Sequence, residues 1–169
     1  MKTQEPNTSF LSVLSERRPV PVPEADEVGA QFNIMPDRYV TETFQLQPFI
    51  IATDYAEAIF DRLYRSDMEA SPNHITMTVL PLLTQRLFYA WCCHRLGLRY
   101  DPRGPELLKI WPTHLAMHYP RLLRLSQNVR YRLDVALFEP VTVTRYAATI
   151  SGNIGKVLRV DATGLVIVL

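Results

Sequence analysis

Residues 129–137 read Val-Arg-Tyr-Arg-Leu-Asp-Val-Ala-Leu, and this stretch decides how the C-terminal third of the chain folds. Apolar side chains alternate with mostly polar ones, and a period of two is typical of a β-strand with one buried face. Segments rich in β-branched residues follow at 141–150, 157–160 and 165–169. Short turns between them, the last at 161–164, predict an antiparallel β-meander over residues 128–169.

The region before the meander, residues 53–127, has the spacing of helices. Asp54 is suited to cap a first helix that ends near Arg65, because Ala56, Ile59, Phe60 and Leu63 follow at helical intervals. A second helix is predicted from Ser71-Pro72 to Gly97, with a kink or break at Pro81. Prolines and a threonine then favour three short helices, at 105–111, 113–119 and 120–127.

Residues 1–48 form a proline-rich segment that we expect to be extended. The run Pro19-Val20-Pro21-Val22-Pro23 restricts the backbone to the polyproline region. Such an arm either lies on its own chain or docks on a partner through apolar side chains spaced along it, namely Phe10, Leu14, Val40 and Phe44. The predicted fold is therefore α+β: an arm over 1–48, and one domain over 49–169 whose helical middle packs on the C-terminal meander.

Composition places the chain among intracellular globular proteins. Of its 169 residues, 47 % are hydrophobic and 21 % are charged. No segment has the uninterrupted apolar length of a membrane span, and residues 1–14 do not resemble a signal peptide. Cys92 and Cys93 are adjacent, so they offer no disulfide framework. We expect a cytoplasmic location, or a place inside an assembled particle.

No catalytic, cofactor or metal motif stands out in the sequence. His114 and His118 are four residues apart, which on a helix would be half of a zinc site, but Leu115 occupies the place of the metalloprotease glutamate. A third ligand is lacking nearby. We therefore expect no catalytic residue, no metal and no cofactor. An enzyme with a dispersed site near His114 and His118 stays open as an alternative.

Charge is distributed unevenly along the chain. Residues 1–69 hold twelve acidic and six basic residues, whereas residues 70–169 hold five acidic and twelve basic ones. Arginines and aromatic residues alternate between 86 and 132, a composition that suits RNA or single-stranded nucleic acid. A second alternative is therefore an RNA-binding accessory protein, with phosphate contacts at Arg121, Arg124, Arg130 and Arg132.

The function that these patterns favour is a non-enzymatic assembly subunit, such as a component of a virus particle or another multi-protein machine. The last residues, Val166-Ile167-Val168-Leu169, are apolar on both faces of a strand, so something must cover them. Together with the arm and the charge separation, this indicates other protein subunits as partners, in a homo- or hetero-oligomer.

Overall fold

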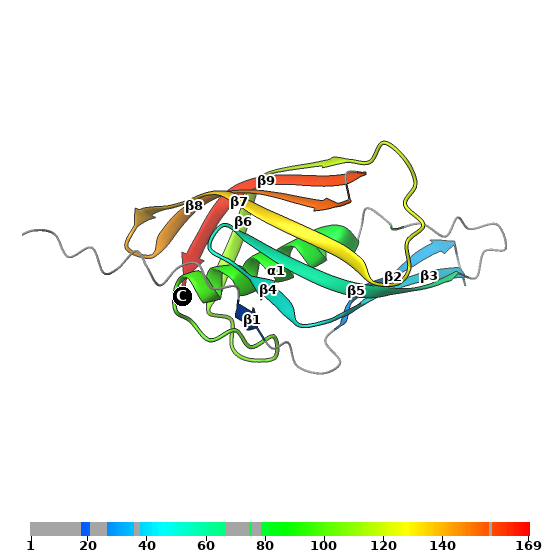
Figure 1. The fold of residues 1–169 in the computed structure, drawn as a ribbon, viewed down its shortest axis with the longest axis horizontal. Helices are drawn as coiled ribbons and strands as arrows, with labels where there is room; N and C mark the ends of the chain where they lie inside the picture. Colours follow the sequence, from blue (N-terminus) through cyan, green and yellow to red (C-terminus); the bar gives the residue numbers. More distant parts are fainter. Residues whose placement is uncertain (1–17, 21–26, 36–37, 67–74, 76–78, 156) are drawn as a thin grey trace, which may run out of the picture.

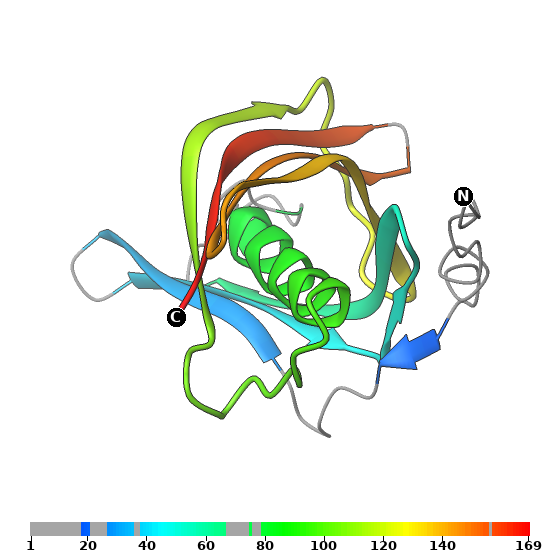
Figure 2. The same cartoon turned by 90° about the vertical axis from the view of Figure 1, so that its left-hand side faces the viewer.

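A long helix lies inside a curled antiparallel sheet (Figures 1 and 2). This is a computed structural model, and it describes residues 18–20, 27–35, 38–66, 75, 79–155 and 157–169. The strands are β1 (Arg18–Val20), β2 (Glu27–Met35), β3 (Arg38–Leu46), β4 (Phe49–Ile51), β5 (Tyr55–Ser66), β6 (Leu108–His118), β7 (Val129–Thr142), β8 (Arg145–Ile154) and β9 (Leu158–Val168).

The order of the strands in the sheet is β1-β4-β5-β7-β8-β9-β6, and every pairing is antiparallel. Strand β5 is long enough to have two neighbours on one edge: β4 pairs with its beginning, and β3, itself paired with β2, with its second half. Strand β6 follows the helix in the chain but lies at the far edge of the sheet, beyond β9. The sheet thus curls around the helix from β5 to β6 (Figure 2).

The helix α1 (Val79–Arg95) is the one helix in the described part of the chain. Pro81 lies in its first turn, where a missing backbone N–H costs nothing, so the helix has no need to kink there. Gly97 ends it, as predicted: its φ of 70° is left-handed, and the Leu98 N–H donates to the Cys93 carbonyl at 2.8 Å. No helix among these residues has the length and apolar character needed to span a membrane.

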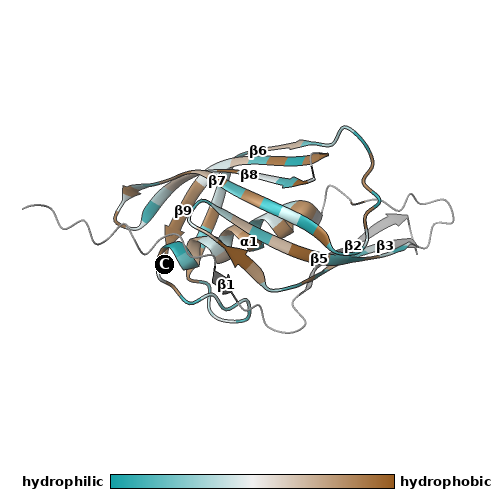
Figure 3. Ribbon diagram, in the orientation of Figure 1, coloured by the Kyte–Doolittle hydropathy of each residue, from teal (hydrophilic) through white to brown (hydrophobic). Residues whose placement is uncertain are grey.

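The core lies between α1 and the concave face of the sheet. The helix α1 carries apolar residues on most of its circumference, which is expected of a helix buried on most sides. The strands show alternating bands of hydropathy (Figure 3). Trp91 packs edge-on against Phe138 at 5.2 Å, and its indole N–H donates to the Ala52 carbonyl at 3.0 Å. The wholly or almost wholly buried apolar residues of the helix are Leu80, Leu83, Leu87, Phe88, Ala90, Trp91, Cys92 and Cys93.

The predicted α+β class, with a helical middle packed on a meander, is wrong. Strands make up most of the described residues, and they form a curled half-barrel around one helix. The first predicted helix is strand β5, whose buried side chains include Ala56, Ala58, Phe60 and Arg62. Their period is two. The period is hard to recognise in the sequence, because an arginine such as Arg62 is normally expected at the surface and here it is buried.

The short helices predicted at 105–111 and 113–119 are also wrong, because both fall largely on strand β6. A proline such as Pro112 is incompatible with a strand only in the interior of a sheet, because it has no backbone N–H to donate to a neighbouring strand. Here it lies on an edge strand, at an irregularity between Pro112 and His114 in the pairing with β9. Residues 120–127 form neither helix nor strand.

Two further expectations change at the ends of the chain. The turn predicted at 161–164 does not occur, since β9 runs without a break through these residues and pairs with β6 and β8. In the N-terminal segment, residues 27–46 supply the β2–β3 hairpin, which joins the sheet through β5. Residues 1–17 and 21–26 lie outside the described part of the structure.

Candidate functional site

A cleft of about 490 Å³ opens between α1 and the segment that follows it. The helix supplies one wall through Leu82, Gln85, Arg86 and Tyr89, whose spacing of three, one and three residues puts them on one face. The segment between α1 and β6 lies below α1 in Figure 2, whereas the strands β7–β9 lie above the helix. A volume of this size suits a small organic molecule.

The second wall comes from the segment, through Tyr100, Asp101, Pro102, Gly104, Pro105 and Glu106. A tight turn shapes it: the Gly104 N–H donates to the Asp101 carbonyl at 3.2 Å, and the Arg103 N–H donates to Asp101 Oδ1 at 2.9 Å. A Cβ at residue 104 would lie 3.0 Å from three side-chain atoms of Asp101. Gly104 therefore leaves room for the carboxylate to fold over the turn.

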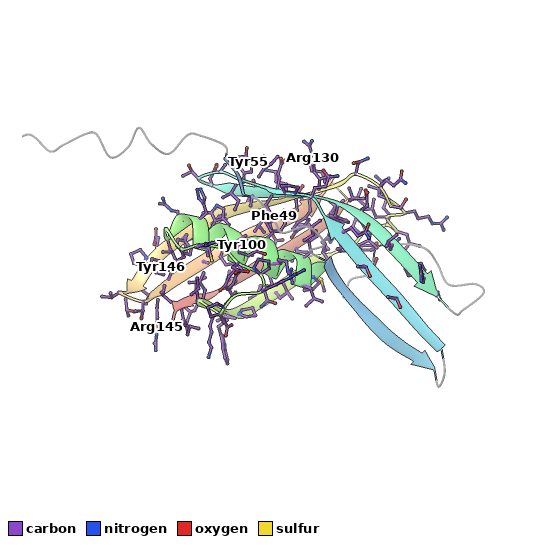
Figure 4. All side chains as sticks on the ribbon, turned by 90° about the horizontal axis from the view of Figure 1, so that it is seen from below. Phe49, Tyr55, Tyr100, Arg130, Arg145 and Tyr146 are labelled. Carbon is purple, nitrogen blue, oxygen red and sulfur yellow. The ribbon has the colours of Figure 1, made fainter. Side chains whose placement is uncertain are left out.

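Two tyrosines join the walls at the back of the cleft. The rings of Tyr89 and Tyr100 lie 6.2 Å apart, and Tyr100 also packs 6.1 Å from Phe49, beside α1 (Figure 4). The Tyr89 hydroxyl accepts the Leu107 N–H at 2.8 Å and is hydrogen-bonded to the Cys93 thiol. Tyr89 is thus tied at its polar end, so its ring is a fixed part of the wall.

The cleft combines groups that can do chemistry with groups that can hold a ligand. Asp101 and Glu106 are exposed carboxylates, Gln85 carries an amide that can donate and accept, and Leu82 is apolar. Among its described lining residues there is no serine, cysteine or histidine. This set supports general-base activation of water by a carboxylate.

The two buried thiols beside the cleft are unreactive by comparison. Burial raises the pKa of Cys93 to about 11, partly offset by the hydrogen bond to Tyr89. The pKa of Cys92 is raised further by burial and by the neighbouring Cys93. Since the thiolate is the nucleophilic form, neither cysteine is suited to attack a substrate.

His114 and His118 do not form a metal site. They lie on strand β6, not on a helix, and residues four apart on a strand are separated by about 13 Å. Both side chains are exposed, and His114 lies close enough to Asp161 to help lower the pKa of that carboxyl. Burial alone would raise this pKa, but hydrogen bonds from Arg159 and Ser151 outweigh burial. The described residues contain no group of three potential metal ligands.

The four arginines predicted to contact phosphate are in different situations. Arg121 and Arg124 are exposed in the connection between β6 and β7, and Arg130 is exposed on β7. Arg132 is already engaged, because it donates to Asp134 at 2.7 Å and lies 3.9 Å above the Tyr55 ring. Figure 4 shows Arg130 and Tyr55 on this part of the sheet. Nucleic-acid binding at these residues stays a prediction.

The residues expected to dock on a partner are only partly described. Phe10 and Leu14 lie outside the described residues, and Val40 is part of strand β3. Phe44 is fully buried within this chain, where it stacks on Phe60 at 4.4 Å.

No motif in the sequence predicts the cleft that Asp101 and Glu106 line. A signal was present: the polar and proline-containing stretch Asp-Pro-Arg-Gly-Pro-Glu directly follows the stop at Gly97. The other lining residues belong to α1. The two sets come together only because the chain folds back along this helix.

Comparison with known proteins adds little to this geometry. No protein-family model matches the chain, and no curated protein matches its sequence. Among solved structures, a thioesterase from Haemophilus influenzae is similar over 75 % of this chain and 79 % of its own, with 14 % identity and a TM-score of 0.47.

The expected non-enzymatic assembly role is not retained. The fold weakens one of the reasons for that expectation. At the apolar end of the chain Val166 is fully buried and β9 is paired on both edges, so the chain itself covers part of this segment, whereas Leu169 is exposed.

Proposed function

We propose that this protein is an enzyme that hydrolyses a small ester or thioester in the cleft between α1 and residues 100–106. The observation that supports this is the presence of two carboxylates, an amide and two aromatic rings around one cleft of about 490 Å³. Hydrolysis of a carbonyl substrate needs a base for water, a donor for the developing oxyanion and an apolar surface for the acyl part.

Each of these needs has a candidate residue. Glu106 or Asp101 accepts a proton from water, and the water oxygen attacks the carbonyl carbon. The Gln85 amide donates a hydrogen bond to the oxygen that becomes negative. The bond to the leaving thiolate or alkoxide then breaks, and that group takes the proton back from the carboxylic acid. Leu82 and the tyrosine rings contact the acyl part.

The test is a panel of acyl thioesters and nitrophenyl esters offered to the purified chain. We expect Glu106→Gln or Asp101→Asn to lower kcat by roughly 10²–10⁴-fold, the usual contribution of a general base. The Asn variant keeps the turn, because an amide oxygen also accepts the Arg103 N–H. The control is Glu139→Gln, an exposed carboxylate on β7 that does not line the cleft.

Two results would refute the proposal. One is a folded protein that hydrolyses no member of the panel. The other is hydrolysis that both cleft substitutions leave at the level of the Glu139→Gln control, since this would locate the base elsewhere.

A further inference from the structure

We infer that the molecule bound in this cleft carries a positively charged organic group, such as a primary or quaternary ammonium. This inference names the substrate class for the proposed hydrolysis and so rests on it. The first reason is charge. Among the described residues that line the cleft, the ionisable side chains are Asp101, Glu106 and Arg86, and together they carry one negative charge in excess. The chain as a whole carries +1, so the cleft departs in sign from the rest of the molecule.

The second reason is the pair of aromatic rings. Tyr89 and Tyr100 lie 6.2 Å apart with their planes tilted by 58°, so they form a corner and not a stack. Aromatic rings next to carboxylates attract organic cations, because the ring face carries negative charge density and the cation keeps its apolar substituents in contact with the ring. The Tyr89 ring is held by its hydrogen bonds to Leu107 and Cys93.

The third reason is the way the charges are divided between the two walls. Both carboxylates belong to the segment after the helix, together with Tyr100, whereas Arg86 belongs to the helix. The Arg86 side chain is half-buried and is not free in the structure. A cation that lies against the segment therefore meets Tyr100, Asp101 and Glu106, and has Arg86 on the opposite wall.

The experiment compares choline with 3,3-dimethylbutanol, which has nearly the same shape but no charge. Binding of each to the full chain is measured by calorimetry and by chemical shifts of cleft residues. We expect choline to bind at least fivefold more tightly than the alcohol, and the difference to shrink at high salt because the carboxylates are exposed. Equal binding of the two compounds, or shifts confined to residues outside the cleft, would overturn the inference.

Variants separate the contributions of ring and charge. Tyr100→Leu should weaken choline binding roughly two- to fivefold, the value of an exposed cation–π contact, and leave the alcohol less affected. Tyr100→Phe keeps the ring face and should bind choline like the wild type. Glu106→Gln should also weaken choline binding, whereas Glu139→Gln should not. Loss of binding in Tyr100→Phe as large as in Tyr100→Leu would count against a role for the ring.

Failure of this inference differs from failure of the proposed function. If neutral esters are hydrolysed and Glu106→Gln abolishes that activity, while choline neither binds nor competes, the hydrolysis stands and the cationic substrate is excluded. If choline binds with the expected dependence on Tyr100 and Glu106 while no ester or thioester is hydrolysed, the cationic ligand stands and hydrolysis is excluded.

Discussion

Replacing Gly152 by alanine tests how α1 and the sheet are held together. Gly152 is buried on β8, and a Cβ at this position would lie 1.7 Å from the Tyr131 hydroxyl oxygen and 2.5 Å from the ring carbon that carries it. Tyr131 cannot easily move away. It is fully buried, and its hydroxyl is 2.6 Å from the hydroxyl of Thr84 on α1.

The direction of that hydrogen bond follows from its neighbour. The Thr84 hydroxyl donates to the Leu80 carbonyl at 2.9 Å, so the Tyr131 hydroxyl is the donor to Thr84. Overpacking a buried site costs about 1–3 kcal/mol, and loss of a buried hydrogen bond costs about 0.5–1.5 kcal/mol. We therefore expect Gly152→Ala to lower the free energy of unfolding by about 3 kcal/mol, or Tm by roughly 6–12 °C.

The assay is urea unfolding followed by far-ultraviolet circular dichroism, with a double-mutant cycle. Tyr131→Phe alone should cost about 1 kcal/mol, because Thr84 keeps its bond to Leu80. In Gly152→Ala/Tyr131→Phe the closest contact is gone, so the double variant should be more stable than the sum of the two single losses predicts. Purely additive losses, or a Gly152→Ala loss below about 0.5 kcal/mol, would refute this reasoning.

Three other predictions concern sites away from Gly152. Gly97→Ala should cost about 1 kcal/mol from its left-handed backbone alone, because nothing lies within 4 Å of the new Cβ; a cost above about 3 kcal/mol in urea unfolding would contradict this. Arg62→Met should cost about 3 kcal/mol, because it leaves Glu42 charged and buried without its ion-pair partner, and adding Glu42→Gln should recover part of the loss. Alkaline pH should destabilise the fold: burial raises the pKa of Cys93 to about 11 from 9.0, so the unfolded chain loses this proton first. Stability should be full below pH 9 and fall by on the order of 1 kcal/mol by pH 10, and a rise over that range would contradict the sign.

Local patterns in the sequence predicted some elements well. The alternation at 129–137 lies within strand β7, and Gly97 ends the central helix as expected, because both signals depend on residues next to one another in the chain. The same local rules failed for β5. Its buried face includes Arg62, and only the pairing with Glu42, twenty residues earlier, makes burial of that arginine acceptable.

For the candidate site, what the sequence determines and what the tertiary structure determines are easier to separate. The sequence alone determined which chemical groups are available: the Asp101–Glu106 turn, two nearby tyrosines, and cysteines without a disulfide framework. It also determined where α1 stops, since a glycine tolerates the left-handed conformation that ends the helix. Only the tertiary structure decided that the chain after Gly97 returns along the face of α1 that carries Gln85, Arg86 and Tyr89, so that these residues meet Tyr100 and the two carboxylates. The sheet covers other parts of the helix, through contacts from β2, β4, β5, β6 and β7. The coverage results from long-range strand pairing, which no local pattern encodes.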